Sequence, residues 1–267
     1  MWLTLPANTP LYRVTREHES WDDVLRGLGA VYNEGGRYNV TFQHTVYASE
    51  DPIVALTEFG WHLSLAKFVD IGLSNPFTYP LVETAKLWRF RLDSDTQLID
   101  ICSAQAAQHF GYPAQLPYNC DPNHHPRKDG KRLRSASQQL ADDVRTFTHP
   151  PKPFHRPEGL QAPSVRTPPL PKYLPRQVVL FVIPAHGSSP KTIQDRAKKL
   201  DDWRIEYEFL AAGGRAASSS DPLVAWMAPR FKLTGNTNPL PKYLGRPRGK
   251  QYPAHKWHTL DIRYSPY

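Results

Sequence analysis

The sequence GGRYNVTFQHTVYASEDPIVALTE, residues 35–58, decides the fold and the chemistry that this chain predicts. It opens on paired glycines, where the backbone can adopt a positive φ or approach another group closely. Residues 38–48 are rich in Tyr, Val, Thr and Phe and predict pleated strands, with a turn at Gln43-His44. Ser49 or Asp51 then caps a helix, because a short side-chain oxygen accepts from free backbone N–H groups, and Pro52 suits its first turn.

The predicted helix carries small or apolar residues near helical spacing, which places Glu58 about two turns from its start. These residues are Ile53, Leu56, Gly60 and Leu63. Turn, strands and helix together bring Arg37, Tyr47 and Glu58 onto three adjacent elements.

These three side chains supply a cation, an amphipathic aromatic ring and a carboxylate. Arginine binds phosphate or a ribose hydroxyl, and tyrosine offers a flat face and a hydroxyl. A carboxylate beside a sugar stabilises the positive charge that develops at the anomeric carbon when a glycosidic bond breaks. A nucleotide with a good leaving base, such as NAD, uses all three. Composition alone equally allows a surface arginine, a core tyrosine and a solvated glutamate.

The order of these residues resembles the RES-domain family, the toxin half of many bacterial Xre–RES toxin–antitoxin pairs, named for an Arg, a Glu and a Ser. The resemblance starts at residues 11–14 and is strongest over 35–39, 46–49 and 55–58. It resumes at 162–166 and continues into the apolar residues 178–181. Two departures stand out: Tyr38 replaces a more usual Trp, and Glu58 and Ser164 lie further apart than in compact members.

The resemblance implies a site. Its catalytic residues would be Arg37, Tyr47, Glu58 and Ser164, with Ser164 bonded to a phosphate, a ribose hydroxyl or Glu58 itself. Its binding residues would be Arg13, Gly36, Tyr38, Asn39 and Ser49. Ser164 is not expected to act as a nucleophile, because no Gly-x-Ser-x-Gly elbow surrounds it.

The resemblance also implies an α+β fold: a mixed, ADP-ribosyltransferase-like split β-sheet core with flanking helices, a long Pro-rich insertion and a C-terminal extension. The activity it implies is cleavage of the nicotinamide–ribose bond of NAD, with phosphate or water as acceptor. NAD is then the substrate and inorganic phosphate a co-substrate, with no metal. Transfer of ADP-ribose to a protein is the alternative. The expected partner is a cognate antitoxin or immunity protein that occludes the active site.

The chain divides into a catalytic part, 1–210, and a linker with a C-terminal extension, 211–267, that packs on the core. Residues 103–160 form an insertion whose proline and charge content predicts an irregular loop, except for one amphipathic helix over 135–147. His124-His125 lacks a third ligand at suitable spacing, so no metal site is expected. Residues 192–202 predict a charged helix before a strand at 203–210. The hexapeptide Pro-Leu-Pro-Lys-Tyr-Leu occurs at 169–174 and again at 239–244.

Composition narrows the alternatives. The net charge of +8 comes from scattered basic residues without a recognisable nucleic-acid-binding motif, so nucleic acid is not expected as the partner. No apolar run is long enough for a membrane helix, and no signal peptide is evident. The two cysteines, Cys102 and Cys120, are typical of reduced thiols in a cytoplasmic protein, although a disulfide between them stays open. A basic, non-enzymatic nucleic-acid or protein binding module is the alternative from a different class.

Overall fold

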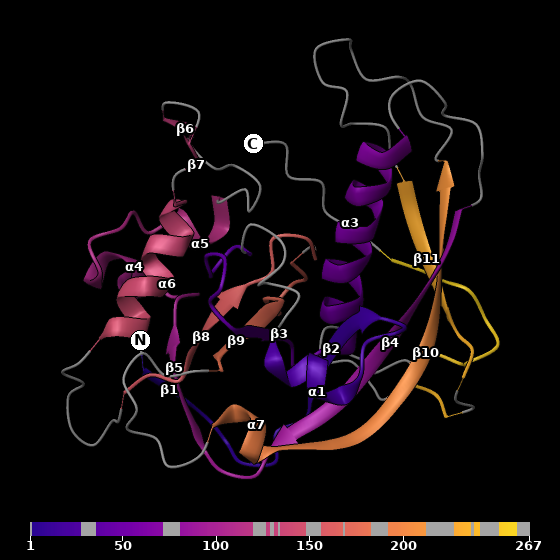
Figure 1. The fold of residues 1–267 in the computed structure, drawn as a ribbon, viewed down its shortest axis with the longest axis horizontal. Helices are drawn as coiled ribbons and strands as arrows, with labels where there is room; N and C mark the ends of the chain where they lie inside the picture. The colour runs from indigo at the N-terminus through magenta and orange to yellow at the C-terminus, as the bar shows by residue number, and fades with distance from the viewer. Residues whose placement is uncertain are drawn as a thin grey trace.

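The computed structural model describes residues 2–27, 36–71, 81–119, 127–128, 131–132, 134–147, 156–167, 169–182, 192–211, 227–235, 238–240 and 251–260. Among them, two five-stranded sheets and several helices form a mixed α+β fold, which confirms the predicted class. In Figure 1, α4, α5 and α6 lie on one side of the molecule, β10 and β11 on the other, and α3 stands between.

The first sheet has the order β1-β5-β8-β9-β3. Its strands are β1 (Trp2–Leu5), β5 (Thr96–Asp100), β8 (Gly159–Pro163), β9 (Arg176–Phe181) and β3 (Thr45–Ala48). Neighbouring strands are antiparallel except for the parallel pair β5 and β8. The apolar residues 178–181 lie in β9, which is placed between β8 and β3.

The second sheet has the order β12-β11-β10-β4-β2 and is antiparallel throughout. Its strands are β12 (His258–Thr259), β11 (Met227–Leu233), β10 (Ala197–Ala211), β4 (Leu81–Leu92) and β2 (Leu11–Arg16). A small hairpin, β6 (Arg127–Lys128) and β7 (Lys131–Arg132), stands apart from both sheets. Because β11 and β12 extend the second sheet, the described part of the C-terminal segment belongs to the folded core.

The helices are α1 (Trp21–Arg26), α3 (Pro52–Ile71), α4 (Ala104–His109), α5 (Leu116–Asn119), α6 (Ala136–Thr146) and α7 (Ile193–Arg196). Both ends of α1 are capped: Ser20 forms a capping box at its start, and Gly27 ends the helix at φ 63°. A Cβ at Gly27 would lie 2.6 Å from the backbone of Thr45, so glycine is required there by both conformation and space.

Three clusters of buried hydrophobic residues lie between the sheets and helices. The first lies between α3 and the second sheet, with Leu56 and Tyr207 as members. The second joins the facing sides of the two sheets, where Phe90 meets Val178 and Leu180. The third covers the other face of the first sheet with α4 and α6. Since Val178 and Val179 belong to different clusters, β9 is buried on both faces, as its unbroken apolar run indicates.

Two predicted elements are wrong. Residues 38–44 are not a strand; the strand begins only at Thr45, and the turn lies at Thr41-Phe42 rather than Gln43-His44. Here the Asn39 side chain donates to the carbonyls of Val40 and Gln43, which removes the need for a neighbouring strand. The predicted helix over 192–202 stops at Arg196, because the chain from Ala197 onward pairs with β4.

The insertion is more regular than its composition indicates. The predicted helix over 135–147 is confirmed as α6, with Ser135 as N-cap and Phe147 as C-cap. Helices α4 and α5 precede it, so 103–119 is not an irregular loop. The histidine pair at 124–125 and Cys120 lie outside the described residues.

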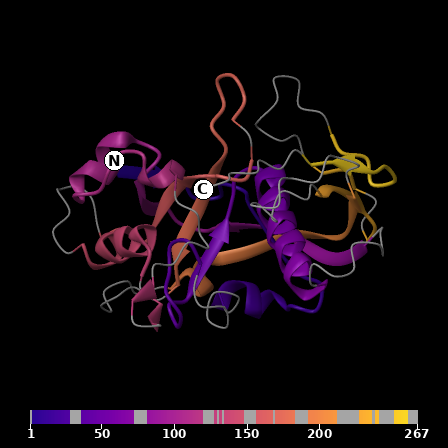
Figure 2. The same ribbon diagram turned by 90° about the horizontal axis from the view of Figure 1, so that it is seen from above.

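The two copies of the hexapeptide differ where both are described. Leu170 forms a bridge to Tyr173 within its own copy and is partly exposed. Leu240 is fully buried and forms its bridge to Tyr252 instead. The first copy lies in the chain between β8 and β9, which projects from the body in Figure 2.

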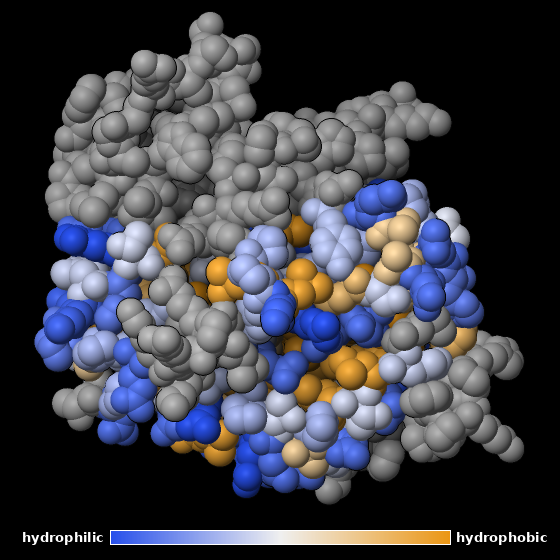
Figure 3. Space-filling view, turned by 180° about the vertical axis from the view of Figure 1, so that it is seen from behind, coloured by the Kyte–Doolittle hydropathy of each residue, from blue (hydrophilic) through white to orange (hydrophobic). Residues whose placement is uncertain are grey.

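The described surface seen in Figure 3 is mostly polar, with apolar residues in small patches. Within the described residues, no helix has the length and apolar character needed to cross a membrane.

Candidate functional site

The turn at Gly36–Asn39 is held by a clamp around the Tyr47 hydroxyl. That hydroxyl accepts from the Tyr38 backbone N–H at 2.8 Å and donates to Asn39 Oδ1 at 2.7 Å. Asn39 Oδ1 also accepts from the Gly36 backbone N–H at 3.0 Å. A Cβ at Gly36 would lie 2.7 Å from the Tyr47 hydroxyl, so the glycine makes room for the clamp. The clamp fixes the backbone on both sides of Arg37.

Arg37 is buried, with 6% of its surface exposed, and its guanidinium donates to two backbone carbonyls. Nη1 reaches Pro163 O at 3.1 Å, and Nη2 reaches Pro117 O in α5. Nε is buried and has no hydrogen-bond partner among the described residues. The guanidinium also lies over the ring of Tyr38, 4.8 Å from its centroid. Arg37 is therefore rigidly placed against the end of β8.

Glu58 lies in α3 and is half-buried. The Ser164 hydroxyl donates to Glu58 Oε1 at 2.5 Å, so of the partners predicted for Ser164 the carboxylate is the one present. Ser164 Oγ is itself oriented by the backbone N–H groups of Arg166 and Thr167, at 3.3 and 3.0 Å. Because Ser164 follows Pro163, Arg37 and Glu58 bind consecutive residues of one short segment. The two side chains are close enough for the charge of Arg37 to act on Glu58.

Burial and neighbouring groups act in opposite directions on the pKa of Glu58. Partial burial raises the pKa of the Glu58 carboxyl, while the Ser164 hydrogen bond and the cations Arg166 and Arg37 act to lower that pKa. Arg166 is 3% exposed, and its guanidinium stacks over Trp61 at 3.4 Å from the ring centroid. The effect of burial is the largest of these, so the pKa of Glu58 lies above that of an ordinary glutamate.

Arg13 places a further cation near the clamp. Its Nε and Nη1 atoms are buried and have no hydrogen-bond partner among the described residues. Burial lowers the pKa of the Arg13 guanidinium, while Glu19 and Tyr47 act in the opposite direction. Such a cation gains by binding an anion, since an uncompensated buried charge is costly.

Three of the predicted binding residues have little exposed surface. Tyr38 and Asn39 are 0% exposed and Ser49 is 1% exposed. Ser49 Oγ donates to the Arg176 carbonyl and accepts from the Asp51 backbone N–H. As placed, these side chains shape the turn and the start of α3.

Sequence reasoning overlooked three contributors. Gln138 of α6 donates to the Gly36 and Asn39 carbonyls, Pro117 receives Arg37, and Arg166 lies beside Glu58. A Ser-x-x-Gln capping box at Ser135 did mark the helix that carries Gln138. Nothing in its pattern showed that this helix would meet residues about a hundred positions earlier.

The described residues contain no group of His, Cys, Asp or Glu able to hold a metal ion. Cys102 is a free thiol, and burial raises its pKa.

No curated protein sequence matches the chain. Among solved structures, the chain is similar to the M. tuberculosis MbcT–MbcA toxin–antitoxin complex, with a TM-score of 0.46 and 15% identity, covering 74% of this chain and 85% of that chain. The family model of the RES domain matches residues 10–207, which include Arg13, Arg37, Tyr47, Glu58 and Ser164. The chain belongs to the RES-domain family.

Proposed function

We propose that this protein consumes NAD by cleaving the bond between nicotinamide and ribose, with phosphate or water as acceptor. The observation that carries the proposal is the pair Ser164–Glu58, joined at 2.5 Å and flanked by the cations Arg37 and Arg166. Membership of the RES-domain family supports the proposal. The resemblance to this family implies an activity on NAD, because the characterised toxins of the family consume it.

The charges of the site suit a dinucleotide. Arg37 and Arg166 both act on the carboxylate of Glu58, and Arg13 and Arg37 both act on the Tyr47 hydroxyl. A pyrophosphate carries two negative charges, so it would be attracted by this excess of guanidinium groups. Arg13 Nε and Nη1, which have no partner in the described part of the chain, are the first candidates to bind a phosphate oxygen, because anion binding would restore the interactions that burial removed.

The chemistry requires little from the protein beyond placement and charge. When the ribose C1′–nitrogen bond breaks, its electron pair stays on the nicotinamide ring, which turns from a cation into a neutral molecule. No general acid is needed for that departure. The ribose becomes oxocarbenium-like, and an ionised Glu58 would stabilise the positive charge. Water then adds through oxygen and releases a proton to solvent, or phosphate adds directly.

Product analysis tests the proposal. Purified protein incubated with NAD should release nicotinamide together with ADP-ribose in phosphate-free buffer, or with ADP-ribose 1″-phosphate when phosphate is present. Labelled protein in place of either product would indicate transfer of ADP-ribose to a protein. Glu58→Gln should reduce turnover at least a hundredfold, because the charge that stabilises the transition state is lost.

Glu206→Gln is the matched control for that substitution. Glu206 forms a partly exposed ion pair with Lys232 at 3.1 Å, so the same change in charge is made away from the bond to Ser164. The turnover of this variant should stay within about twofold of wild type, because a partly exposed pair contributes little. Intact NAD at high concentrations of wild-type protein would reject the enzymatic proposal and favour a basic binding module.

The same proposal includes a role as a toxin or effector that acts in the cytoplasm. A cognate antitoxin or immunity protein would then cover the segment that joins Arg37 and Glu58. Bacteria that express the wild-type chain should lose NAD and stop growing, whereas those that express Glu58→Gln should keep both. Growth arrest with an unchanged NAD level would separate toxicity from NAD consumption.

A further inference from the structure

We infer that Gln138 is a positioning residue for Arg37, and that α6 serves as a splint, meaning that its side chains hold the segment from Gly36 to Thr45 in place by hydrogen bonds. Gln138 is 2% exposed, and its Nε2 donates to Gly36 O at 3.0 Å and Asn39 O at 2.8 Å. These carbonyls lie at the two ends of the turn that contains Arg37. The inference rests on the proposed function for its catalytic consequence.

The Gln138 side chain is itself fixed. Its Oε1 accepts from the Ser135 backbone N–H at 3.1 Å, and the Ser135 hydroxyl accepts from the Gln138 backbone N–H at 3.2 Å. This capping box ties one end of the amide to the start of α6 and directs the other end at the turn. The orientation of Arg37 is therefore linked to the start of a well-formed helix.

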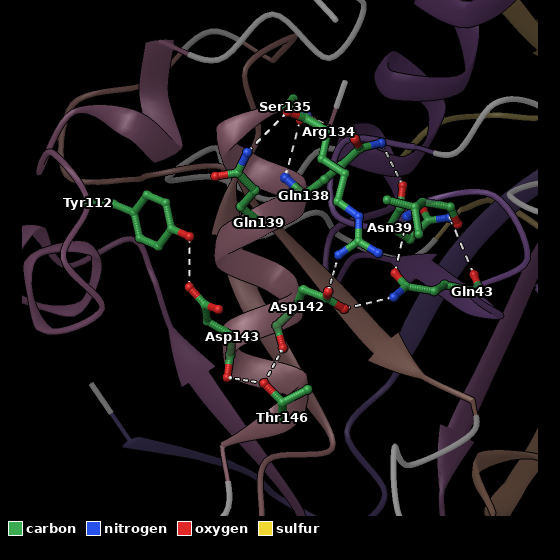
Figure 4. Close-up of polar contacts among 11 residues, drawn as sticks. Asn39, Gln43, Tyr112, Arg134, Ser135, Gln138, Gln139, Asp142, Asp143 and Thr146 are labelled. Carbon is green, nitrogen blue, oxygen red and sulfur yellow. Dashed lines mark hydrogen bonds and ion pairs between the residues drawn. The ribbon is translucent and has the colours of Figure 1, made fainter. Parts of the chain in front are cut away.

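Contacts on the same face of α6 continue along the segment. One turn beyond Gln138, Asp142 Oδ1 accepts from Gln43 Nε2 at 2.8 Å. Further along, Arg145 donates to Thr45 Oγ1 at 3.1 Å. Positions 138, 142 and 145 share one face of a helix by their spacing. In Figure 4, Gln138 and Asp142 lie toward Asn39 and Gln43, whereas Gln139 and Asp143 lie on the other side.

The segment depends on such support because its backbone before Thr45 lies outside any strand of the described sheets. Asn39 satisfies the carbonyls of Val40 and Gln43, and Gln138 satisfies those of Gly36 and Asn39. Buried carbonyls that lose their donors are strongly disfavoured, so the turn would rearrange without Gln138. Arg37 would then leave its position against Pro163.

Gln138→Glu separates positioning from helix capping. Glutamate is the usual partner in a Ser-x-x-Glu capping box, so α6 should form at least as well. The same substitution replaces the amide donor with a carboxylate oxygen that faces two carbonyl oxygens. Gln139→Glu is the matched control, since Gln139 is the exposed neighbour on α6 and its side chain donates to the Arg134 carbonyl at 3.2 Å, away from the turn.

Steady-state kinetics with NAD give the catalytic readout. Gln138→Glu should raise KM for NAD tenfold or more with kcat changed less than threefold, because the Arg37 charge is proposed to attract NAD while Glu58 acts on the ribose. Relative to wild type, the variant should recover as the pH falls and the new carboxyl gains a donor proton. Gln139→Glu should match wild type. A Gln138→Glu enzyme with wild-type KM would overturn the inference.

Amide hydrogen exchange on the same three proteins keeps this outcome distinct from a failure of the proposed function. Peptides covering 36–45 should exchange at least tenfold faster in Gln138→Glu, and at wild-type rate in Gln139→Glu. Equal exchange in all three proteins would overturn the inference, whether or not the wild-type protein consumes NAD. If exchange is faster in Gln138→Glu but the wild-type protein leaves NAD intact, the proposed enzymatic function would be rejected. The inference that Gln138 positions the segment would stand.

Discussion

Replacing Ser164 with alanine should shift the pH at which the protein becomes active. The Ser164 hydroxyl donates to Glu58 Oε1 at 2.5 Å, and this bond is one of the influences that lower the pKa of the Glu58 carboxyl. It stabilises the ionised form of Glu58, and an alanine has nothing to donate in its place. Without it, burial would act on the carboxyl with less opposition and its pKa would rise further.

The size of the change in pKa follows from the kind of bond. A hydrogen bond to a charged group contributes about 1.5–3 kcal/mol. A factor of ten in an equilibrium corresponds to about 1.4 kcal/mol, so losing the bond should raise the pKa of Glu58 and make its ionisation about ten- to a hundredfold less favourable. Because Glu58 is half-buried and partly screened by solvent, the lower end of that range is expected.

The assay is the rate of nicotinamide release as a function of pH. Activity of the wild-type protein should rise with pH through the raised pKa of Glu58, above the ordinary glutamate value of about 4.3. In Ser164→Ala the same rise should occur at a higher pH, with the rate on the alkaline plateau reduced much less than the rate on the acid limb. At a fixed pH on the acid limb, the rate of the variant should therefore be about tenfold below that of wild type.

Ser94→Ala is the control, since the exposed Ser94 hydroxyl also donates to a carboxylate, Asp93 Oδ1 at 3.3 Å. It should leave the profile unchanged. If Ser164→Ala lowered the plateau and left the acid limb in place, Ser164 would act on the substrate and not through Glu58, which would refute the role given to its hydrogen bond.

Two further substitutions test the energetics of the site. Glu58→Gln should be more stable than wild type by about 1 kcal/mol at pH 7.5, because removing a buried charge from an active site commonly stabilises a protein. Since the pKa of Glu58 is raised in the folded protein, the stability of the wild type falls as the pH increases through that pKa. Urea unfolding should therefore show that the difference in stability between the two proteins disappears near pH 4. An equal difference at both pH values would contradict this. Tyr47→Phe removes the hydroxyl that binds Tyr38 N–H and Asn39 Oδ1 and should lower unfolding free energy by about 1–3 kcal/mol, whereas Tyr112→Phe, which breaks one exposed bond to Asp143, should cost less in the same denaturation experiment.

Local chemistry made several elements predictable. Ser20 and Ser135 cap helices because their hydroxyls accept nearby backbone N–H groups, and the capping interaction depends only on neighbours in sequence. Pro52 begins α3, which carries Glu58 as its spacing indicated. The apolar run of β9 predicts burial on both faces without any knowledge of what covers it.

The two wrong elements have different causes. Residues 197–199 have the composition of a helix end but pair with β4, which lies about a hundred residues earlier, so a long-range partner overrode local preference. Residues 38–44 have strand-forming side chains, yet the Asn39 amide supplies the partners that a second strand would provide. Similarly, the sequence indicated Arg37 and Glu58 but not Pro117 or Gln138, since both come from an insertion with no local sign of its destination.

The arrangement of Arg37 bears on how the site would act. Both terminal nitrogens of its guanidinium are engaged by the carbonyls of Pro163 and Pro117, so in this conformation Arg37 has no free fork for a phosphate. Its charge nevertheless favours the ionised form of Glu58 and adds to the attraction for an anionic dinucleotide. Arg13 has two buried nitrogens without a hydrogen-bond partner among the described residues, so it is the better placed of the two for direct contact with a phosphate. These positions support different roles for the two arginines. Arg13 would contact the dinucleotide, and the positive charge of Arg37 would attract the dinucleotide and favour the ionised carboxylate of Glu58.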